Sequence, residues 1–255
     1  MIYKRVAARL RAQDWLAIVI ELGIVILGVF IGTWVANWNQ ERAAKAETRR
    51  MIVQLGPSLS QMTDFYRAAR QYYATTRAYA TTAIAGWRGD QAVGDADFVI
   101  AAYQASQTFA LGTDSSTWSA ILGADQLRNI DDPQMRTDLS FIMSADYSQI
   151  ERPLDTAYRQ NVRRIIPVEI QDAIRARCGD RHRPDRPSIL ILPPSCAIAI
   201  APADAARAAA LLRAHPELLA DLQWHIAAVA AFLDNIVPFE AAAKRVERAS
   251  RGNSR

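Results

Sequence analysis

One stretch of the chain is apolar for far longer than any other. A run of 21 residues, LAIVIELGIVILGVFIGTWVA, contains one ionisable side chain, Glu21. An α-helix rises about 1.5 Å per residue, so this run reaches about 32 Å, close to the ~30 Å hydrocarbon core of a bilayer. Trp15 precedes the run, and Trp34 and Trp38 lie at its other end, as indole rings do at membrane interfaces. The pattern predicts a transmembrane helix over residues 15–38 with these three tryptophans as interfacial anchors.

Two other interpretations of this run are weaker. A buried core helix seldom extends beyond about 20 residues without a polar stripe. A cleaved signal peptide has an apolar region of about 7–15 residues and a small-residue cleavage site, whereas this run is longer and ends in Trp-Val-Ala-Asn-Trp. We therefore expect an uncleaved anchor preceded by a short tail, residues 1–14.

One face of the predicted membrane helix is small and polar. Turning about 100° per residue places Glu21, Gly28 and Gly32 within about 40° of one line along the helix. The G-x-x-x-G spacing lets two helix backbones approach closely, and a carboxyl in hydrocarbon should find a polar partner or become protonated. These residues predict self-association or docking to another membrane subunit. The alternative is a single helix whose Glu21 reaches toward the interface.

Beyond the membrane the hydrophobic pattern is mostly helical. Residues 39–86 predict a stalk that leaves the membrane and becomes the first bundle helix, with a kink or break at Gly56-Pro57. Apolar side chains recur at intervals of three and four in two stretches that should face a core. These are Leu59, Met62, Tyr66, Ala69 and Tyr73, and then Leu218, Leu222, His225, Val229, Phe232 and Leu233.

Capping residues and prolines predict where the other helices begin. Residues 87–177 form a helical domain in this interpretation, and residues 203–250 form the C-terminal helices. Side-chain acceptors before a first turn, and proline within it, are the signals used. The predicted helices are Asp95 to about Leu111, a short one capped by Ser115 or Ser116, one from Asp132-Pro133, one from Asp204 to Ala214, and one from Pro216 to about Ser250.

A proline-rich stretch, residues 178–202, interrupts the helical pattern with five of the 11 prolines. The two cysteines of the chain, Cys178 and Cys196, predict a disulfide formed in an oxidising compartment, and two buried free thiols are the alternative. Two short apolar runs within the stretch, 188–192 and 197–200, predict paired strands in a small disulfide-closed hairpin. The fold class is therefore mainly α, one N-terminal transmembrane helix continuing into an extracytoplasmic helical bundle.

The membrane segment and its flanks also resemble a known group of sequences. Glu21 is followed by an apolar run, the G-x-x-x-G pair and the sequence NWNQER. This order resembles a bacterial family of uncharacterised single-pass inner-membrane proteins, in which many members have glutamate at the position of Gln40. A second stretch around Trp118 extends the likeness to about residues 10–165. The resemblance implies an inner-membrane anchor with a helical domain and no assigned activity.

The distribution of charge bears on the class of partner but does not decide the orientation in the membrane. The chain carries 30 Lys and Arg among 26 Asp and Glu, scattered rather than gathered, so a nucleic-acid partner receives no support. Four cationic side chains precede the membrane run and four follow it, so the positive-inside rule decides nothing. The predicted disulfide favours a cytoplasmic N-terminus and a periplasmic C-terminal domain. The lipid bilayer and a second copy or another membrane subunit are the expected partners.

Candidate chemistry in the sequence is sparse. Nucleophile elbows, phosphate-binding loops, zinc-protease motifs and dinucleotide fingerprints are all absent from the sequence, so we expect neither a catalytic residue nor a cofactor. Cys178, His182 and Cys196 lack the fourth ligand of a structural zinc site. His215 is expected to lie near a helix cap and His225 in the core.

These observations predict a non-enzymatic single-pass membrane protein whose helical domain serves interaction or assembly. One alternative is a ligand-sensing regulatory protein that signals through another membrane protein. A second alternative is a membrane-anchored hydrolase with a site around Asp114, Ser115 and Ser116 or around His182.

Overall fold

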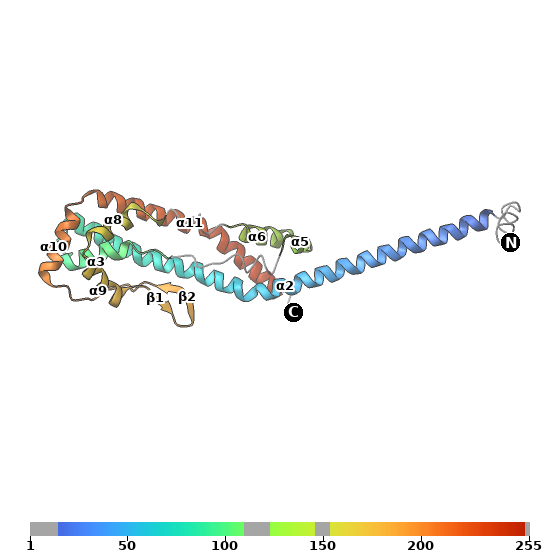
Figure 1. Ribbon diagram of the computed structural model, residues 1–255, viewed down its shortest axis with the longest axis horizontal. Helices are drawn as coiled ribbons and strands as arrows, with labels where there is room; N and C mark the ends of the chain where they lie inside the picture. Colours follow the sequence, from blue (N-terminus) through green and yellow to red (C-terminus); the bar gives the residue numbers. More distant parts are fainter. Residues whose placement is uncertain (1–14, 110–122, 146–153, 253–255) are drawn as a thin grey trace.

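The computed structural model describes residues 15–109, 123–145 and 154–252, which are mainly α-helical and form an elongated molecule (Figure 1). One helix dominates this shape: α2 (Trp15–Trp87) has 73 residues and is therefore about 110 Å long. Its first half projects alone, and its second half lies inside a packed part of the chain. We call this packed part, the described residues from 48 to 252, the helical region.

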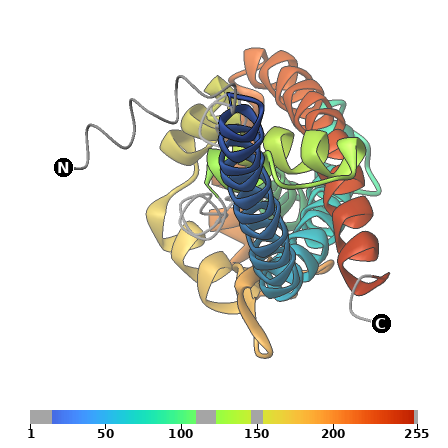
Figure 2. The same ribbon diagram turned by 90° about the vertical axis from the view of Figure 1, so that its right-hand side faces the viewer.

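The helical region is built around α2 and one long returning helix, α11 (Glu217–Gly252). α11 lies beside α2, runs in the opposite direction and ends close to the point where α2 enters the helical region (Figure 1). Viewed along α2, α11 lies on one side and the shorter helices α8 and α9 on the other (Figure 2). The shorter elements are α3 (Asp95–Ala105), α5 (Ala124–Leu127), α6 (Pro133–Met143), α8 (Ala157–Ile165), α9 (Val168–Cys178), β1 (Arg181–Arg183), β2 (Arg186–Ile191) and α10 (Pro202–Arg213).

Burial changes abruptly along α2. No side chain described between residues 15 and 47 is buried, whereas from Thr48 onward each turn places one or two side chains in the core. The inward face predicted for α2 is confirmed, since all five of its residues are buried. The face predicted for α11 is confirmed as well, with Leu233 half-buried at its edge.

Of the kink or break predicted at Gly56-Pro57, the break does not occur. α2 continues through Pro57 without interruption and changes direction gently where it enters the helical region (Figure 1). Proline removes one backbone hydrogen bond, but the turns on both sides are held by fully buried side chains, Leu55 and Leu59. Pro238 likewise lies inside α11 without ending it. Tertiary packing therefore overrides the local preference at both prolines.

The core consists of two apolar clusters stacked along α2. The first, nearer the projecting half of α2, includes Leu55, Leu59, Leu139, Phe232 and Ile236. The second, at the far end, includes Phe98, Tyr158, Ile174, Leu212 and Leu222. Fully burying a large apolar side chain contributes about 1.5–3 kcal/mol, so these two clusters supply most of the driving force for folding.

Helix boundaries match the capping signals in some places only. Asp132 caps α6 as predicted, accepting hydrogen bonds from the backbone of Gln134 at 2.9 Å and of Met135 at 3.3 Å. Asp204, in contrast, lies within the first turn of α10 and does not cap it. The helix begins earlier because Pro202 occupies its first position, where a missing N–H costs nothing.

The first short helix, α3, also differs from its prediction at both ends. Gly94 rather than Asp95 precedes it, and it ends at Ala105 rather than near Leu111. The Ser106 hydroxyl donates to the Tyr103 carbonyl at 2.7 Å, and the chain then leaves the helix so that Phe109 enters the first cluster. The short helix predicted after Ser115 or Ser116 lies outside the described residues.

The small sheet pairs differently from the prediction. β2 overlaps the predicted run 188–192 at residues 188–191, but its antiparallel partner is β1, and residues 197–200 are not a strand. The tight turn between the strands is closed by Arg183, which donates to Asp185 through Nε and Nη2 at 2.7 Å each. Such a turn favours the nearest segment as a partner, whereas residues 197–200 pack Ile198 and Ile200 against the second cluster.

Candidate functional site

Two described helices are long and apolar enough to cross a membrane. In α11, 39% of the apolar window is buried inside the molecule, because its apolar residues form the core face that packs on α2. In α2 the window has a mean hydropathy of 2.5 and none of it is buried. The projecting half of α2 therefore has no apolar partner within the described chain.

The glycine face of α2 is open. A methyl group added at Gly28 or Gly32 would meet no atom within 4 Å, and the same is true of Gly23. Gly23 lies about 140° around the helix from Gly28, so the two positions test opposite faces. Glu21 is exposed on the same side as Gly28 and Gly32. The structure thus leaves all three predicted association residues accessible to a second helix.

The predicted anchors lie at the two ends of the bare apolar stretch. Trp15 and Trp34 are about 70% exposed and Trp38 is 44% exposed. The rings of Trp34 and Trp38 stack with centroids 6.3 Å apart, and the Arg42 guanidinium lies 3.8 Å from the Trp38 ring centroid. An aromatic pair capped by a cation suits the boundary between hydrocarbon and headgroups.

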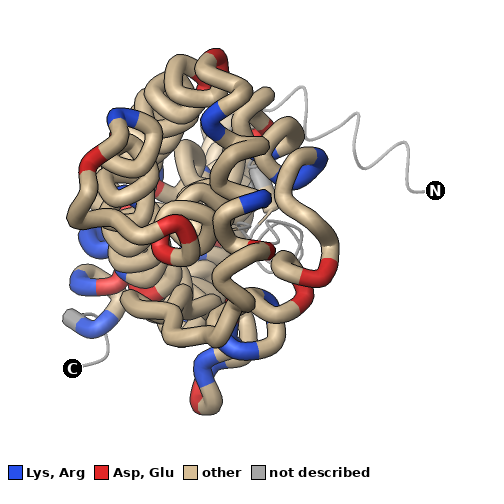
Figure 3. The backbone as a smooth tube through the Cα atoms, turned by 90° about the vertical axis from the view of Figure 1, so that its left-hand side faces the viewer, with Lys and Arg blue, Asp and Glu red and all other residues tan. Residues whose placement is uncertain are grey.

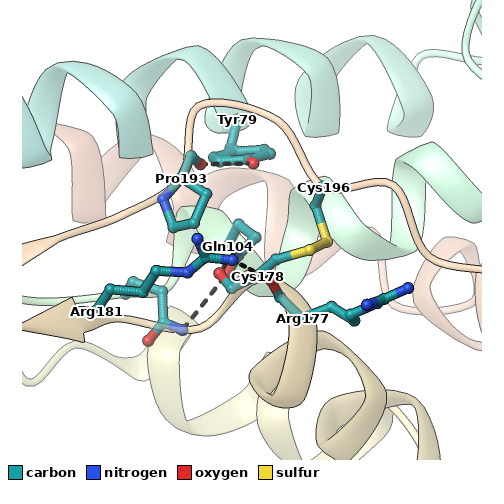
Figure 4. Close-up of a disulfide and its surroundings, with 8 residues drawn as sticks. Tyr79, Gln104, Arg177, Cys178, Arg181, Pro193 and Cys196 are labelled. Atoms are coloured by element: carbon teal, nitrogen blue, oxygen red, sulfur yellow. Dashed lines mark hydrogen bonds between the residues drawn. A yellow bond between two sulfur atoms is a disulfide. The ribbon is translucent and has the colours of Figure 1, made fainter.

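The predicted disulfide is present and closes the loop that contains the hairpin. Cys178 and Cys196 are joined, with Cα atoms 5.4 Å apart. Figure 4 shows how the loop is attached to the helices: Gln104 of α3 donates to the Cys178 carbonyl at 2.7 Å, and Tyr79 of α2 donates to the Pro193 carbonyl at 2.9 Å. Both sulfur atoms are consumed by the bond, which rules out the alternatives of two free thiols and of a zinc site here.

A layer of buried polar side chains separates the two apolar clusters. The sequence alone does not reveal it, because its members come from four segments that are far apart in the chain. We call this set the polar layer; it consists of Thr76, Gln104, Ser106, Gln107, Thr156 and His225. Most of its groups are satisfied locally, for example Thr76, whose hydroxyl donates to the Tyr73 carbonyl at 3.0 Å.

Two arginines of α8 converge on one side of this layer. Arg159 donates to the Ser106 carbonyl at 2.6 Å, and Arg163 donates to Ser106 Oγ at 3.2 Å and to Gln107 Oε1 at 2.8 Å. Burial, and then the positive charge of Arg159, lower the pKa of Arg163. No described carboxylate lies within ion-pair distance of either guanidinium. Their spacing of four residues on α8 is the one signal in the sequence that could have indicated a shared face.

His225 is the member of the layer whose hydrogen bonding is incomplete. Only 2% of the residue is exposed, its Nδ1 lies 2.7 Å from Thr156 Oγ1, and its Nε2 has no partner. Burial, and then the charge of Arg159, lower its pKa to about 4, against a weak opposing effect of the Ala105 backbone. His225 is therefore a neutral core residue at pH 7, as predicted. His215 lies near the start of α11 and contacts Glu217 at 2.7 Å.

His225 also borders a hollow between α2 and α11, which we call the α2–α11 groove. The groove has a volume of about 260 Å³ and is mostly apolar. It opens where the two apolar clusters meet, since its wall includes Tyr73 and Val229 from the first and Ala80 and Ala105 from the second. The groove therefore gives solvent a route to the boundary between the two halves of the core.

The remaining predicted chemistry finds little structural support. Asp114, Ser115 and Ser116 lie outside the described residues, and His182 is exposed on the hairpin, where its Nδ1 donates to the Pro187 carbonyl. Among the described residues no cluster of His, Cys, Asp and Glu could hold a metal ion. At the end remote from the projecting helix, Lys and Arg are interspersed with Asp and Glu (Figure 3).

Comparisons with protein-family models, curated proteins and solved structures find no match to this chain.

Proposed function

We propose that this chain is a non-enzymatic single-pass membrane protein that assembles with a second copy, or with another membrane subunit, through Glu21, Gly28 and Gly32. The observation that carries the proposal is an unburied apolar helix whose glycine face is open and which continues without interruption into the helical region. Assembly in the bilayer is thereby coupled to the arrangement of two helical regions outside it.

The physical basis of association is close packing rather than the hydrophobic effect. Lipid tails are as apolar as leucine, so membrane helices associate through van der Waals contact and interhelical hydrogen bonds. Gly28 and Gly32 offer a flat surface one turn long, and Glu21 lies almost two turns before Gly28 on the same side. In a dimer the two Glu21 side chains would share a proton and so hydrogen-bond each other instead of facing hydrocarbon.

The proposed location is a bacterial inner membrane, with the N-terminus in the cytoplasm and the helical region in the periplasm. The disulfide supports this orientation, because such bonds persist in oxidising compartments and are rare in the cytosol. The family resemblance of the membrane segment supports the same membrane. Alkaline phosphatase fused after Arg255 should be active in this orientation and inactive in the reverse one.

Replacing Gly28 and Gly32 together by isoleucine tests the association. The two methyl-bearing side chains would separate the backbones, and losing about 1–2 kcal/mol of packing and hydrogen bonding should weaken dimerisation roughly tenfold. Crosslinking of the full chain in membranes measures the dimer fraction. Gly23→Ile is the matched control, because it adds the same side chain to the opposite face and should leave the dimer unchanged. An undiminished dimer in the double variant, or an equal loss in the control, contradicts the proposal.

A further inference from the structure

The α2–α11 groove is the one apolar hollow of the helical region bordered by a fully buried polar group without a partner, within the described residues. Its floor includes Tyr73, Ala105 and His225, which are each less than 3% exposed. Its rim is formed by exposed residues of α2, Ala74 and Arg77. A small molecule could therefore enter from the surface and cover the floor without opening the core.

One polar atom beneath the floor makes no hydrogen bond. The Thr156 hydroxyl and His225 Nδ1 share one hydrogen bond at 2.7 Å, in which the donor depends on the tautomer of the ring. His225 Nε2 is buried and has no partner, a situation that costs about 1–3 kcal/mol. The floor thus carries an unused polar atom beneath an apolar surface.

The rim carries an unused positive charge. Arg70 also lines the groove, but it forms an ion pair with Glu240, which pairs with Lys244 as well. The Arg77 guanidinium makes no hydrogen bond or ion pair with the described residues. The surroundings therefore hold three cations and one carboxylate, and the side chain at the rim that remains available is cationic.

We propose that the α2–α11 groove binds a small amphipathic carboxylic acid, with its apolar body over Tyr73 and Val229 and its carboxylate on Arg77. The size of the groove limits the body. A cavity of about 150 Å³ accepts benzene, so 260 Å³ accommodates more than a single ring but not the two chains of a membrane lipid. A medium-chain fatty acid or a substituted aromatic acid has the required shape and charge.

The position of the groove indicates where this acid comes from. Trp38 marks the proposed membrane interface, and Tyr73 lies 35 residues further along α2, a distance of about 50 Å. No bilayer lipid reaches that far without leaving the membrane. The ligand is therefore a water-soluble monomer taken from the compartment that contains the helical region.

Equilibrium dialysis with radiolabelled octanoate tests this site. The full chain is placed in nanodiscs, and empty nanodiscs correct for partition into lipid. We expect one saturable site per chain, weaker binding of 1-octanol, and still weaker binding of octylamine because its charge matches that of Arg77. Arg77→Gln should weaken octanoate binding roughly tenfold, the effect of losing one charge-assisted hydrogen bond, and should leave 1-octanol unchanged.

A large side chain placed in the groove distinguishes octanoate binding in the groove from binding elsewhere on the protein. Ala74→Phe places a ring in the groove from an exposed position, so it should abolish octanoate binding without disturbing the core. Ala78→Phe is the matched control, since Ala78 is exposed on the same helix but outside the groove. The absence of saturable binding, octylamine binding as tight as that of octanoate, or equal binding by the two phenylalanine variants would each overturn the proposal.

Discussion

At the scale of single residues, His225 shows what the polar layer does to stability. Its pKa falls from the usual 6.5 to about 4, so the folded protein resists a proton that the unfolded chain accepts. The contribution of neutral His225 to the free energy of unfolding is therefore fully present above pH 6.5 and is lost as the pH falls toward 4. At about 1.4 kcal/mol per pKa unit, the loss due to His225 alone is about 3 kcal/mol.

The replacement His225→Gln should remove this loss while keeping a polar group in the layer. The difference between the free energies of unfolding of wild type and variant should change by about 3 kcal/mol from pH 7 to pH 4, and denaturant titration of the full chain in nanodiscs measures it. Trp224→Gln, at the exposed position next to His225 on α11, is the control; it changes no titratable group and should leave the pH dependence as it is. Parallel curves for wild type and His225→Gln would refute the assignment.

At the scale of the helix, the same substitution, glycine to alanine, should have opposite effects on the stability of the protein at two positions of α2. A Cβ at Gly56 would meet nothing within 4 Å, whereas a Cβ at Gly86 would lie 2.2 Å from the Phe98 ring. Gly56→Ala should stabilise the protein by about 0.5 kcal/mol, because alanine is the better helix former but the Cβ before Pro57 cancels part of the gain. Gly86→Ala should destabilise it by about 1–3 kcal/mol, because Phe98 is fully buried and must move.

Denaturant unfolding of the two alanine variants checks both signs in one experiment. Gly56 also lies beside Pro57, where the sequence predicts a break, so a stabilising Gly56→Ala would show that this turn is helical in solution. A destabilising Gly56→Ala would mean that the turn needs glycine for another conformation.

The helices and strands also show which features of the fold local sequence patterns can predict. The long apolar helix from Trp15, the cap at Asp132 and the inward faces of α2 and α11 depend on neighbours within a few turns, and the sequence predicts each of them correctly. The continuity of α2 through Pro57 and the choice of β1 as the partner of β2 depend on competition between local and tertiary contacts. The sequence left a kink or a break open at Pro57, where the helix is unbroken, and its prediction for the partner of β2 is wrong.

The α2–α11 groove could not be predicted for a related reason. It exists because Tyr73 and Val229, 156 positions apart, face each other across two helices, and periodicity identifies faces without saying which faces meet. His225 was correctly assigned to the core, but nothing local shows that its second nitrogen would be unpaired.

At the scale of the whole molecule, α2 is one continuous helix that joins the exposed apolar stretch to the helical region. Spin labels on Glu41→Cys and Ala78→Cys are separated by 37 residues and should lie about 55 Å apart if the helix is continuous. A right-angled break at Pro57 would shorten this distance to about 40 Å. Pulsed electron spin resonance distinguishes the two values, and the native cysteines do not interfere because they are bonded to each other.

The pairing of α2 with α11 has a consequence for biogenesis. The inward face of α2 follows the exposed apolar stretch of the same helix and emerges early, yet its partner comes much later in the chain, as the 170-residue separation between Arg70 and Glu240 illustrates. Contacts this distant in sequence form late, and an uncovered apolar helix is prone to aggregate meanwhile. The earliest core helix to be synthesised is thus the last to be completed.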